Sequence, residues 1–241
     1  MINLDNVILN DVEFGIYRDG PVGISVSCGA DSAIILYLLM KEVKHDLHIY
    51  NVIGDRRQSV LEPAVDRVIA KCVELTGKTN YFIHKTYSPR PPGELVFQVY
   101  KESLDKGEVD IVYTGLTKFP PDDVHANWEI NWPEWHLQFR RYDAVNPLFG
   151  VEIKIPEGTD CSEPPLTIDG KYKDKISQDA RVYNPMINHT KQSIASLYRA
   201  LGVEETLFPH TRSCEDDNHT NGHCGKCWWC KERLWGFGHL E

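Results

Sequence analysis

The sequence predicts an α/β fold in which a parallel sheet carries helices on both faces. Segments rich in β-branched residues alternate with amphipathic helical segments through the first half of the chain, and glycines close several of the helical segments. This alternation favours right-handed crossovers and a parallel sheet. Four of the seven cysteines lie between residues 214 and 230, which predicts a metal-binding appendage. We therefore expect an α/β domain over 1–205 and a metal-binding segment over 206–241.

Four segments are predicted to be strands of the sheet. They are apolar and rich in β-branched or aromatic residues, and glycine ends two of them. The predicted strands are residues 22–27, 47–54, 80–84 and 109–115. Ligands bind beyond the carboxyl ends of such strands, so we expect the site at the junctions that follow them.

Four further segments repeat apolar residues at spacings of three and four, which predicts helices with one buried face. The predicted helices span residues 32–44, 59–77, 94–107 and 191–202. The stretch from about 116 to 180 is rich in proline, tryptophan and charge, and we expect a variable loop region with one short strand at 151–158. Its aromatic residues either anchor a long loop or stack on a planar substrate.

Composition limits the classes of function that the protein can have. The 241-residue chain has a net charge of −9, which argues against binding nucleic acid through its overall field. No apolar run approaches the ~20 residues of a membrane helix, and the N-terminus lacks the basic region of a secretory signal. We therefore expect a cytoplasmic protein without a membrane partner.

The junction after the first predicted strand reads Ser27-Cys28-Gly29-Ala30-Asp31-Ser32. Such a turn is either a capped helix start or a cradle for phosphate, in which helix N–H groups and serine hydroxyls meet the anion. The segment resembles the S-G-G-x-D-S loop of the PP-loop ATP pyrophosphatases, with Cys28 in place of the second residue. Cys28 is read as a small packed residue rather than a reactive thiol. The resemblance implies a PP-loop/HUP-like fold, and contacts to the pyrophosphate of ATP and its Mg²⁺ from Ser27, Gly29, Asp31 and Ser32.

The C-terminal cysteines follow the spacing C-x9-C-x2-C-x2-C, formed by Cys214, Cys224, Cys227 and Cys230. Four thiolates make a closed tetrahedral Zn²⁺ site, which is structural. An iron–sulfur cluster is the competing interpretation of this spacing. His219 and His223 are further candidate ligands.

A phosphate loop combined with a four-cysteine cluster resembles the 7-cyano-7-deazaguanine synthase (QueC-like) branch of the PP-loop enzymes. The family's C-terminal signature appears as Ser213-Cys214, then Cys224-Gly225-x-Cys227-x-x-Cys230-x-x-Arg233 and Phe237, with Glu215 replacing the family's tyrosine. The family's G-Q-R-H-x-x-E-L-x-x-A segment appears in part from Gly54 to Ala64. The resemblance implies that Gly54, Arg56 and Gly115 join the nucleotide site, and that Asp31 and Lys191 act in catalysis.

The resemblance implies an ATP-dependent C–N ligase that releases AMP and pyrophosphate. It would convert 7-carboxy-7-deazaguanine and ammonia to the nitrile, as a homodimer. Residues 116–136, where the family contacts its substrate, differ from the family pattern. Two alternatives therefore stay open: a repurposed relative that adenylates another carboxylate or couples a deazaguanine to a protein or nucleic acid, and a non-catalytic ATP-binding scaffold.

Overall fold

The computed structural model describes residues 4–9, 12–54, 58–88, 93–118, 120–125, 128, 179, 181–214, 216, 219 and 222–241. Arg56, Cys161 and the strand predicted at 151–158 lie outside these ranges. No helix within them has both the length and the apolar character that crossing a bilayer requires.

A five-stranded sheet forms the centre of the molecule. Every neighbouring pair of its strands is parallel, in the order β5-β4-β3-β6-β7. The strands are β3 (Val22–Ser25), β4 (Leu47–Gly54), β5 (Tyr81–Ser88), β6 (Ile111–Tyr113) and β7 (Val182–Tyr183). The predicted parallel sheet is therefore confirmed, with the first predicted strand at its centre.

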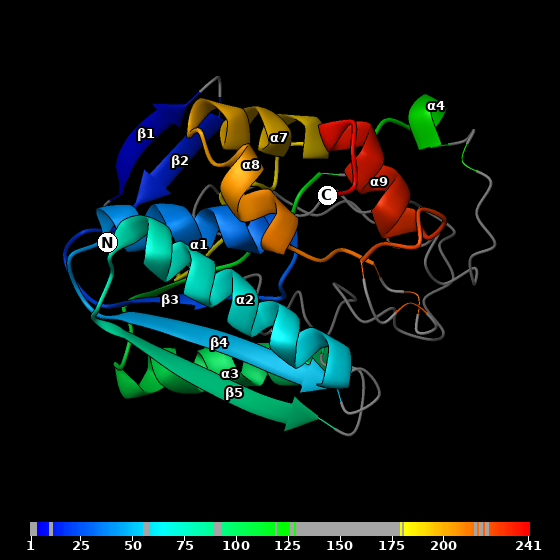
Figure 1. The fold of residues 1–241 in the computed structure, drawn as a ribbon. Helices are drawn as coiled ribbons and strands as arrows, with labels where there is room; N and C mark the ends of the chain where they lie inside the picture. Colours follow the sequence, from blue (N-terminus) through cyan, green and yellow to red (C-terminus); the bar gives the residue numbers. More distant parts are fainter. Residues whose placement is uncertain are drawn as a thin grey trace, which may run out of the picture.

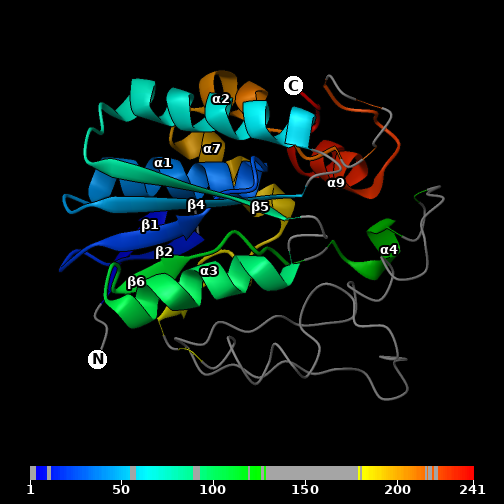
Figure 2. The same cartoon turned by 90° about the horizontal axis from the view of Figure 1, so that it is seen from below.

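Three helices connect the first four strands of this sheet. They are α1 (Ala30–Glu42), α2 (Gln58–Thr76) and α3 (Gly93–Lys106). The chain builds β4 and β5 on one side of β3 and then returns to place β6 on the other side. Reversing direction across a right-handed crossover moves the connecting helix to the opposite face. Figures 1 and 2 accordingly show α1 and α2 over one face and α3 over the other.

The reversal makes the gap between β3 and β6 the topological switch point, where ligands of such sheets bind. Helix α1 starts at this point and is apolar almost all round, because it lies between the sheet and other helices. Ten of its residues are buried. A helix buried on every side is held firmly, so the turn that precedes it is well positioned.

The rest of the chain adds short helices on the α1 side and at the carboxyl end of the sheet. They are α4 (Asp122–His125), α7 (Lys191–Ala200), α8 (Glu204–Leu207), the 3-10 helix η4 (Phe208–His210) and α9 (Trp228–Phe237). Helix α7 packs against both α1 and α9. Both views place α9 towards the end at which β4 and β5 point.

An antiparallel hairpin near the N-terminus was not predicted. Its strands, β1 (Asp5–Leu9) and β2 (Val12–Ile16), form a separate two-stranded sheet. The ring of Phe14 stacks on Tyr113, with 5.9 Å between centroids, and the Tyr17 N–H donates to the Tyr113 hydroxyl at 2.8 Å. The hairpin is thus fastened to the sheet through the end of β6.

Candidate functional site

The turn between β3 and α1 closes on itself through its two serines. The Ser27 N–H donates to Ser32 Oγ at 3.2 Å, and the Ser32 hydroxyl lies 3.2 Å from the Gly29 carbonyl, to which it donates. Gly29 is the N-cap of α1, and no side chain caps the helix. The alternative of a helix start capped by a side chain is therefore not formed, and the first N–H groups of α1 keep their capacity to bind an anion.

Cys28 takes a left-handed backbone conformation, with φ of 65°, and is the one non-glycine residue of the described chain with positive φ. This conformation is strained for an L-residue and natural for glycine. The Cys28 side chain is 1 % exposed and belongs to the main hydrophobic core. Its thiol donates to the Arg212 carbonyl at 3.5 Å. These contacts agree with a packed residue.

Gly115 follows β6 and runs against the first turn of α1. A Cβ placed on Gly115 would lie 2.8 Å from the Ser32 nitrogen and 3.0 Å from its Cα, both backbone atoms. Only glycine allows the two segments to approach this closely. Gly115 therefore lies beside the turn at 27–32, as predicted. Its lack of a side chain lets the end of β6 approach the start of α1 at the switch point.

A buried ion pair joins this turn to α7. Lys191 Nζ lies 2.5 Å from Asp31 Oδ2 and 3.5 Å from Glu232 Oε2, and the Lys191 side chain is 6 % exposed. Burial alone would lower the pKa of Lys191, but the two carboxylates more than offset it, so this pKa lies above its usual value. Asp31 and Lys191, 160 residues apart, thus meet as one charged unit.

Further polar side chains line the carboxyl edge of the sheet beside this turn. Asn51 on β4 donates through Nδ2 to the Val26 carbonyl at 2.7 Å, while its Oδ1 is buried without a hydrogen-bond partner among the described residues. The same is true of Thr114 Oγ1, just after β6, and of Asp31 Oδ1. Buried polar atoms in folded proteins are normally satisfied, so this edge is suited to a polar ligand.

The four predicted cysteine ligands converge. The sulfur atoms of Cys214, Cys224, Cys227 and Cys230 all lie within 4.8 Å of one another, and the sulfurs of Cys224 and Cys230 are 3.9 Å apart. Four sulfurs bound tetrahedrally at ~2.3 Å to one zinc ion are roughly 3.8 Å apart, so the spacing fits a metal site. No disulfide joins the cysteines of the described chain.

The backbone of the cluster is folded to suit a metal. The N–H groups of Lys226 and Cys227 point at Cys224 Sγ at 3.4 and 3.2 Å, and Gly225 takes a φ of 69° between the two cysteines. Burial raises the pKa of the Cys214 thiol, so a group of thiolates here needs a cation beside it. His223 has other partners: its Nε2 accepts from the Ser213 N–H at 3.2 Å.

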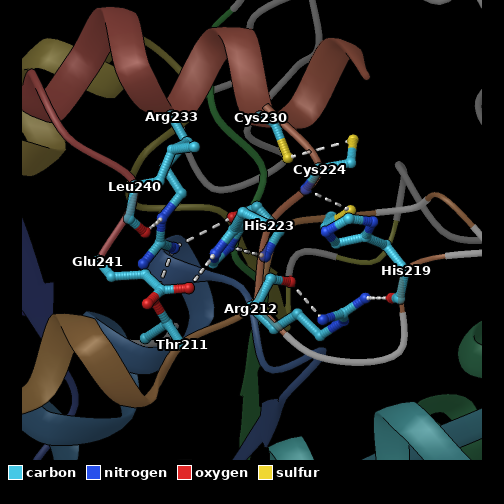
Figure 3. Close-up of polar contacts among 12 residues, drawn as sticks. Thr211, Arg212, His219, His223, Cys224, Cys230, Arg233, Leu240 and Glu241 are labelled. Carbon is cyan, nitrogen blue, oxygen red and sulfur yellow. Dashed lines mark hydrogen bonds and ion pairs between the residues drawn. The ribbon is translucent and has the colours of Figure 1, made fainter. Parts of the chain in front are cut away.

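Arg233 fastens the segment around the cluster (Figure 3). Its side chain is fully buried and donates to the Leu240 carbonyl at 2.7 Å, to Thr211 Oγ1 at 2.7 Å and to the Phe208 carbonyl at 3.0 Å. The guanidinium also lies over the Phe208 ring, 3.6 Å from its centroid. Burial lowers the pKa of Arg233 to about 10. The motif arginine is thus a structural centre of this segment.

The cysteine segment contacts both the turn at 27–32 and Lys191, the partner of Asp31 in that turn. The Arg212 N–H donates to the Cys28 carbonyl at 2.8 Å, which complements the thiol contact in the other direction. On α9, a Cβ at Gly236 would lie 2.8 Å from both Cβ and the carbonyl oxygen of Lys191. The cysteine segment and the turn are therefore parts of one candidate site.

Comparison with known families agrees with this geometry. Residues 167–241 match the family model described as "Queuosine biosynthesis protein QueC". The chain is QueC-like in this segment. No curated protein gives a significant match to the chain. The matched segment contains Lys191, the four cysteines and Arg233, whereas the turn at 27–32 and the residues around 116–136 precede it.

The structure places most of the predicted site residues together. Lys191 contacts Asp31, and Gly115 lies against the backbone of Asp31 and Ser32. Ser27 and Gly29 form hydrogen bonds with Ser32. Gly54 ends β4, beyond the last residue that pairs with β3. Arg56 lies outside the described residues.

Sequence reasoning missed Glu232, Asn51 and Thr114. Glu232 carries one usable signal, because it lies four residues before Gly236 and therefore on the same face of a helix. Trp128 is one of the aromatic residues expected either to anchor a long loop or to stack on a planar substrate. The centroid of its ring lies 4.6 Å from that of Trp228, so Trp128 packs on α9.

Proposed function

We propose that this QueC-like protein is an ATP-dependent C–N ligase of the 7-cyano-7-deazaguanine synthase type. The observation that carries the proposal is the ion pair between Asp31 and Lys191. It joins a turn typical of phosphate binding to the segment that matches the QueC family model. The proposed substrates are ATP, ammonia and a planar deazaguanine carboxylate.

The residues of the turn suit a triphosphate. The uncapped N-terminus of α1, the Ser27 hydroxyl and the Lys191 ammonium supply N–H and O–H donors and positive charge on one side of the switch point. Asp31 is the carboxylate placed to hold Mg²⁺, since its Oδ1 has no hydrogen-bond partner among the described residues. Bound Mg²⁺ would neutralise phosphate charge that develops as pyrophosphate leaves.

The proposed reaction needs activation because a carboxylate has no good leaving group. Attack of the carboxylate oxygen on the α-phosphorus forms an acyl adenylate and releases pyrophosphate. Ammonia displaces AMP and gives the amide, and a second ATP activates the amide oxygen so that loss of AMP leaves the nitrile. The protein's task is to align the reacting oxygens and keep water out, so no dedicated nucleophile is required.

We further propose that the cysteine cluster holds one structural Zn²⁺. Four thiolates leave no open coordination position, so the ion would organise the fold and take no part in the reaction. The N–H groups aimed at Cys224 Sγ would stabilise the thiolate charge. A coloured, iron-containing protein would instead indicate an iron–sulfur cluster.

A direct assay tests the proposed reaction. Purified protein is incubated with ATP, Mg²⁺, ammonia and 7-carboxy-7-deazaguanine, and AMP, pyrophosphate and the nitrile are measured. The wild type should form all three. Asp31→Ala should abolish turnover, whereas Asp46→Ala, which removes an exposed acid at the opposite end of the sheet, should not change it.

The same assay separates the alternatives. AMP release that stops before the nitrile would favour a repurposed relative, and other carboxylates would then be screened. No ATP turnover with any acid would favour a scaffold. Sedimentation of the active protein tests the proposed homodimer.

A further inference from the structure

Glu232 is a buried carboxylate that the proposed reaction does not use. Its residue is 2 % exposed, and Oε2 lies 3.5 Å from Lys191 Nζ, on the ammonium that also contacts Asp31 at 2.5 Å. Carboxylates are rarely buried to this degree unless they are paired. The two acids therefore share one cation, and a single change at Lys191 affects both.

Helix α9 fixes the position of Glu232. One turn later, Gly236 contacts the Cβ and carbonyl of Lys191 so closely that only a glycine fits. At the other end of the helix, Cys227 is the N-cap and Cys230 lies in the first turn, so the cysteine cluster anchors the start of α9. The carboxylate thus approaches Lys191 from a helix that is held at both ends.

The shared cation has a consequence for magnesium. In the structure Asp31 pairs with Lys191 through Oδ2, whereas the proposed Mg²⁺ contact is at Oδ1. Mg²⁺ on Oδ1 would take up much of the negative charge that Lys191 now faces, and a buried ammonium that loses its counter-charge is strongly unfavourable. Glu232 offsets this loss, because it gives Lys191 a second carboxylate that the metal does not share. Arg233, also buried nearby, is occupied by Leu240, Thr211 and Phe208 and does not replace Lys191.

We propose that Glu232 is a positioning residue that holds and balances the Lys191 ammonium, so that Asp31 can share its charge with magnesium when ATP binds. This inference rests on the proposed function, because it assigns Mg²⁺ to Asp31. It also gives the cysteine segment a part in ATP use beyond stability, since the helix that the cluster anchors carries Glu232.

The test is the magnesium dependence of nucleotide binding. Calorimetry with α,β-methylene-ATP, which cannot be cleaved at the reacting bond, is run on the full chain over a range of Mg²⁺ concentrations. In Glu232→Gln the side-chain volume stays and the charge is lost. We expect the Mg²⁺ concentration for half-maximal binding to rise about tenfold, while binding at saturating Mg²⁺ stays near the wild-type level.

Two variants serve as controls. Glu205→Gln removes the same charge from an exposed position on α8 and should leave the magnesium dependence unchanged. Glu232→Asp keeps the charge but withdraws it by one methylene, and it should raise the half-maximal Mg²⁺ concentration by about threefold. Metal content and thermal unfolding are measured on each variant to confirm that it is folded.

The outcomes distinguish a failure of the proposed function from a failure of the role of Glu232. A wild type that binds no analogue at any Mg²⁺ concentration overturns both the proposed function and this role of Glu232. A wild type that binds, together with an unchanged magnesium dependence in Glu232→Gln, overturns the role of Glu232 alone. An equal loss of affinity at every Mg²⁺ concentration would mean a structural role and also overturns it. If Glu232→Gln does not fold, an unchanged magnesium dependence in Glu232→Asp overturns the role of Glu232.

Discussion

The contact between α9 and α7 at Gly236 provides a sharp test of how the QueC-like segment is seated. The perturbation is Gly236→Ala, which adds one methyl group. That methyl would lie 2.5 Å from Lys191 Cγ and 2.8 Å from both the Cβ and the carbonyl oxygen of Lys191. The Cγ can move by rotation of the side chain, but the other two atoms are fixed to α7. The helices must therefore separate.

Two opposing effects set the magnitude. Replacing glycine by alanine inside a helix is worth about 1 kcal/mol in favour of the variant. Forcing a methyl group into a packed interface destabilises by about 1–3 kcal/mol. Contacts at 2.8 Å fall well short of the 3.4 Å at which ordinary Cβ contacts begin, and two of the three are rigid, so the upper part of the range applies. The variant should lose about 2 kcal/mol of unfolding free energy.

Urea unfolding followed by tryptophan fluorescence measures this difference. Ser193→Ala on α7 is the control, because it raises helix propensity without adding an atom at the interface. It should leave stability unchanged or raise it slightly. A Gly236→Ala protein that is as stable as the wild type, or more stable, would refute the close approach of the two helices and with it the placement of Lys191.

Three further predictions concern other residues. Cys28→Gly should be more stable than Cys28→Ala by up to about 1 kcal/mol in urea unfolding, because both lose the thiol and only glycine accepts a φ of 65° without strain; equal stabilities would contradict the left-handed turn. Cys227→Ser should lose bound metal by elemental analysis, whereas Cys72→Ala, at a buried thiol outside the cluster, should keep about one ion per chain. Burial and the neighbouring His84 lower the pKa of His48, so below about pH 6.5 the unfolded chain binds a proton that the folded chain resists. Stability should therefore fall between pH 7.5 and 5, the fall should be smaller in His48→Gln, and equal shifts in the urea midpoint would refute this.

The sheet was predictable where a strand has a long, regular pattern. The strand predicted at 47–54 matches β4, because its apolar residues are bounded by Gly54. The strand predicted at 80–84 extends to Ser88, because β5 pairs residue by residue with β4 as far as Gly54. Pairing with a neighbour prolonged a strand whose own pattern had become polar.

Short elements held by distant residues could not be predicted. Strand β7 has only two residues, too few for any periodicity, and exists because it pairs with β6. The N-terminal hairpin depends on the hydroxyl of Tyr113, which accepts from the Tyr17 N–H and donates to the Gly15 carbonyl at 3.1 Å. Nothing local in the sequence indicates these contacts.

The candidate site likewise has features that a local pattern predicts and features that depend on distant residues. The cysteine spacing and the turn at 27–32 carry their information within a few residues, and the structure forms both. Glu232 stands between Cys230 and Arg233 in a motif that gives it no role, and its importance comes from meeting Lys191 at 3.5 Å. Its spacing of four residues from Gly236 places it on one face of a helix, but this spacing does not indicate that the face meets Lys191.

The four cysteines lie in a segment that is small for a folded unit. Residues 211–241 are by themselves too few to build a hydrophobic core, and segments of that length generally need a metal or disulfides. It nevertheless supplies Glu232 to the ion pair at the turn, and the backbone of Arg212 to Cys28. A site that depends on contacts of this accuracy cannot rest on a segment that frays. We therefore expect that a metal ion held by the four cysteines would stabilise one wall of the proposed nucleotide site, and that removal of the ion should weaken nucleotide binding before it unfolds the sheet.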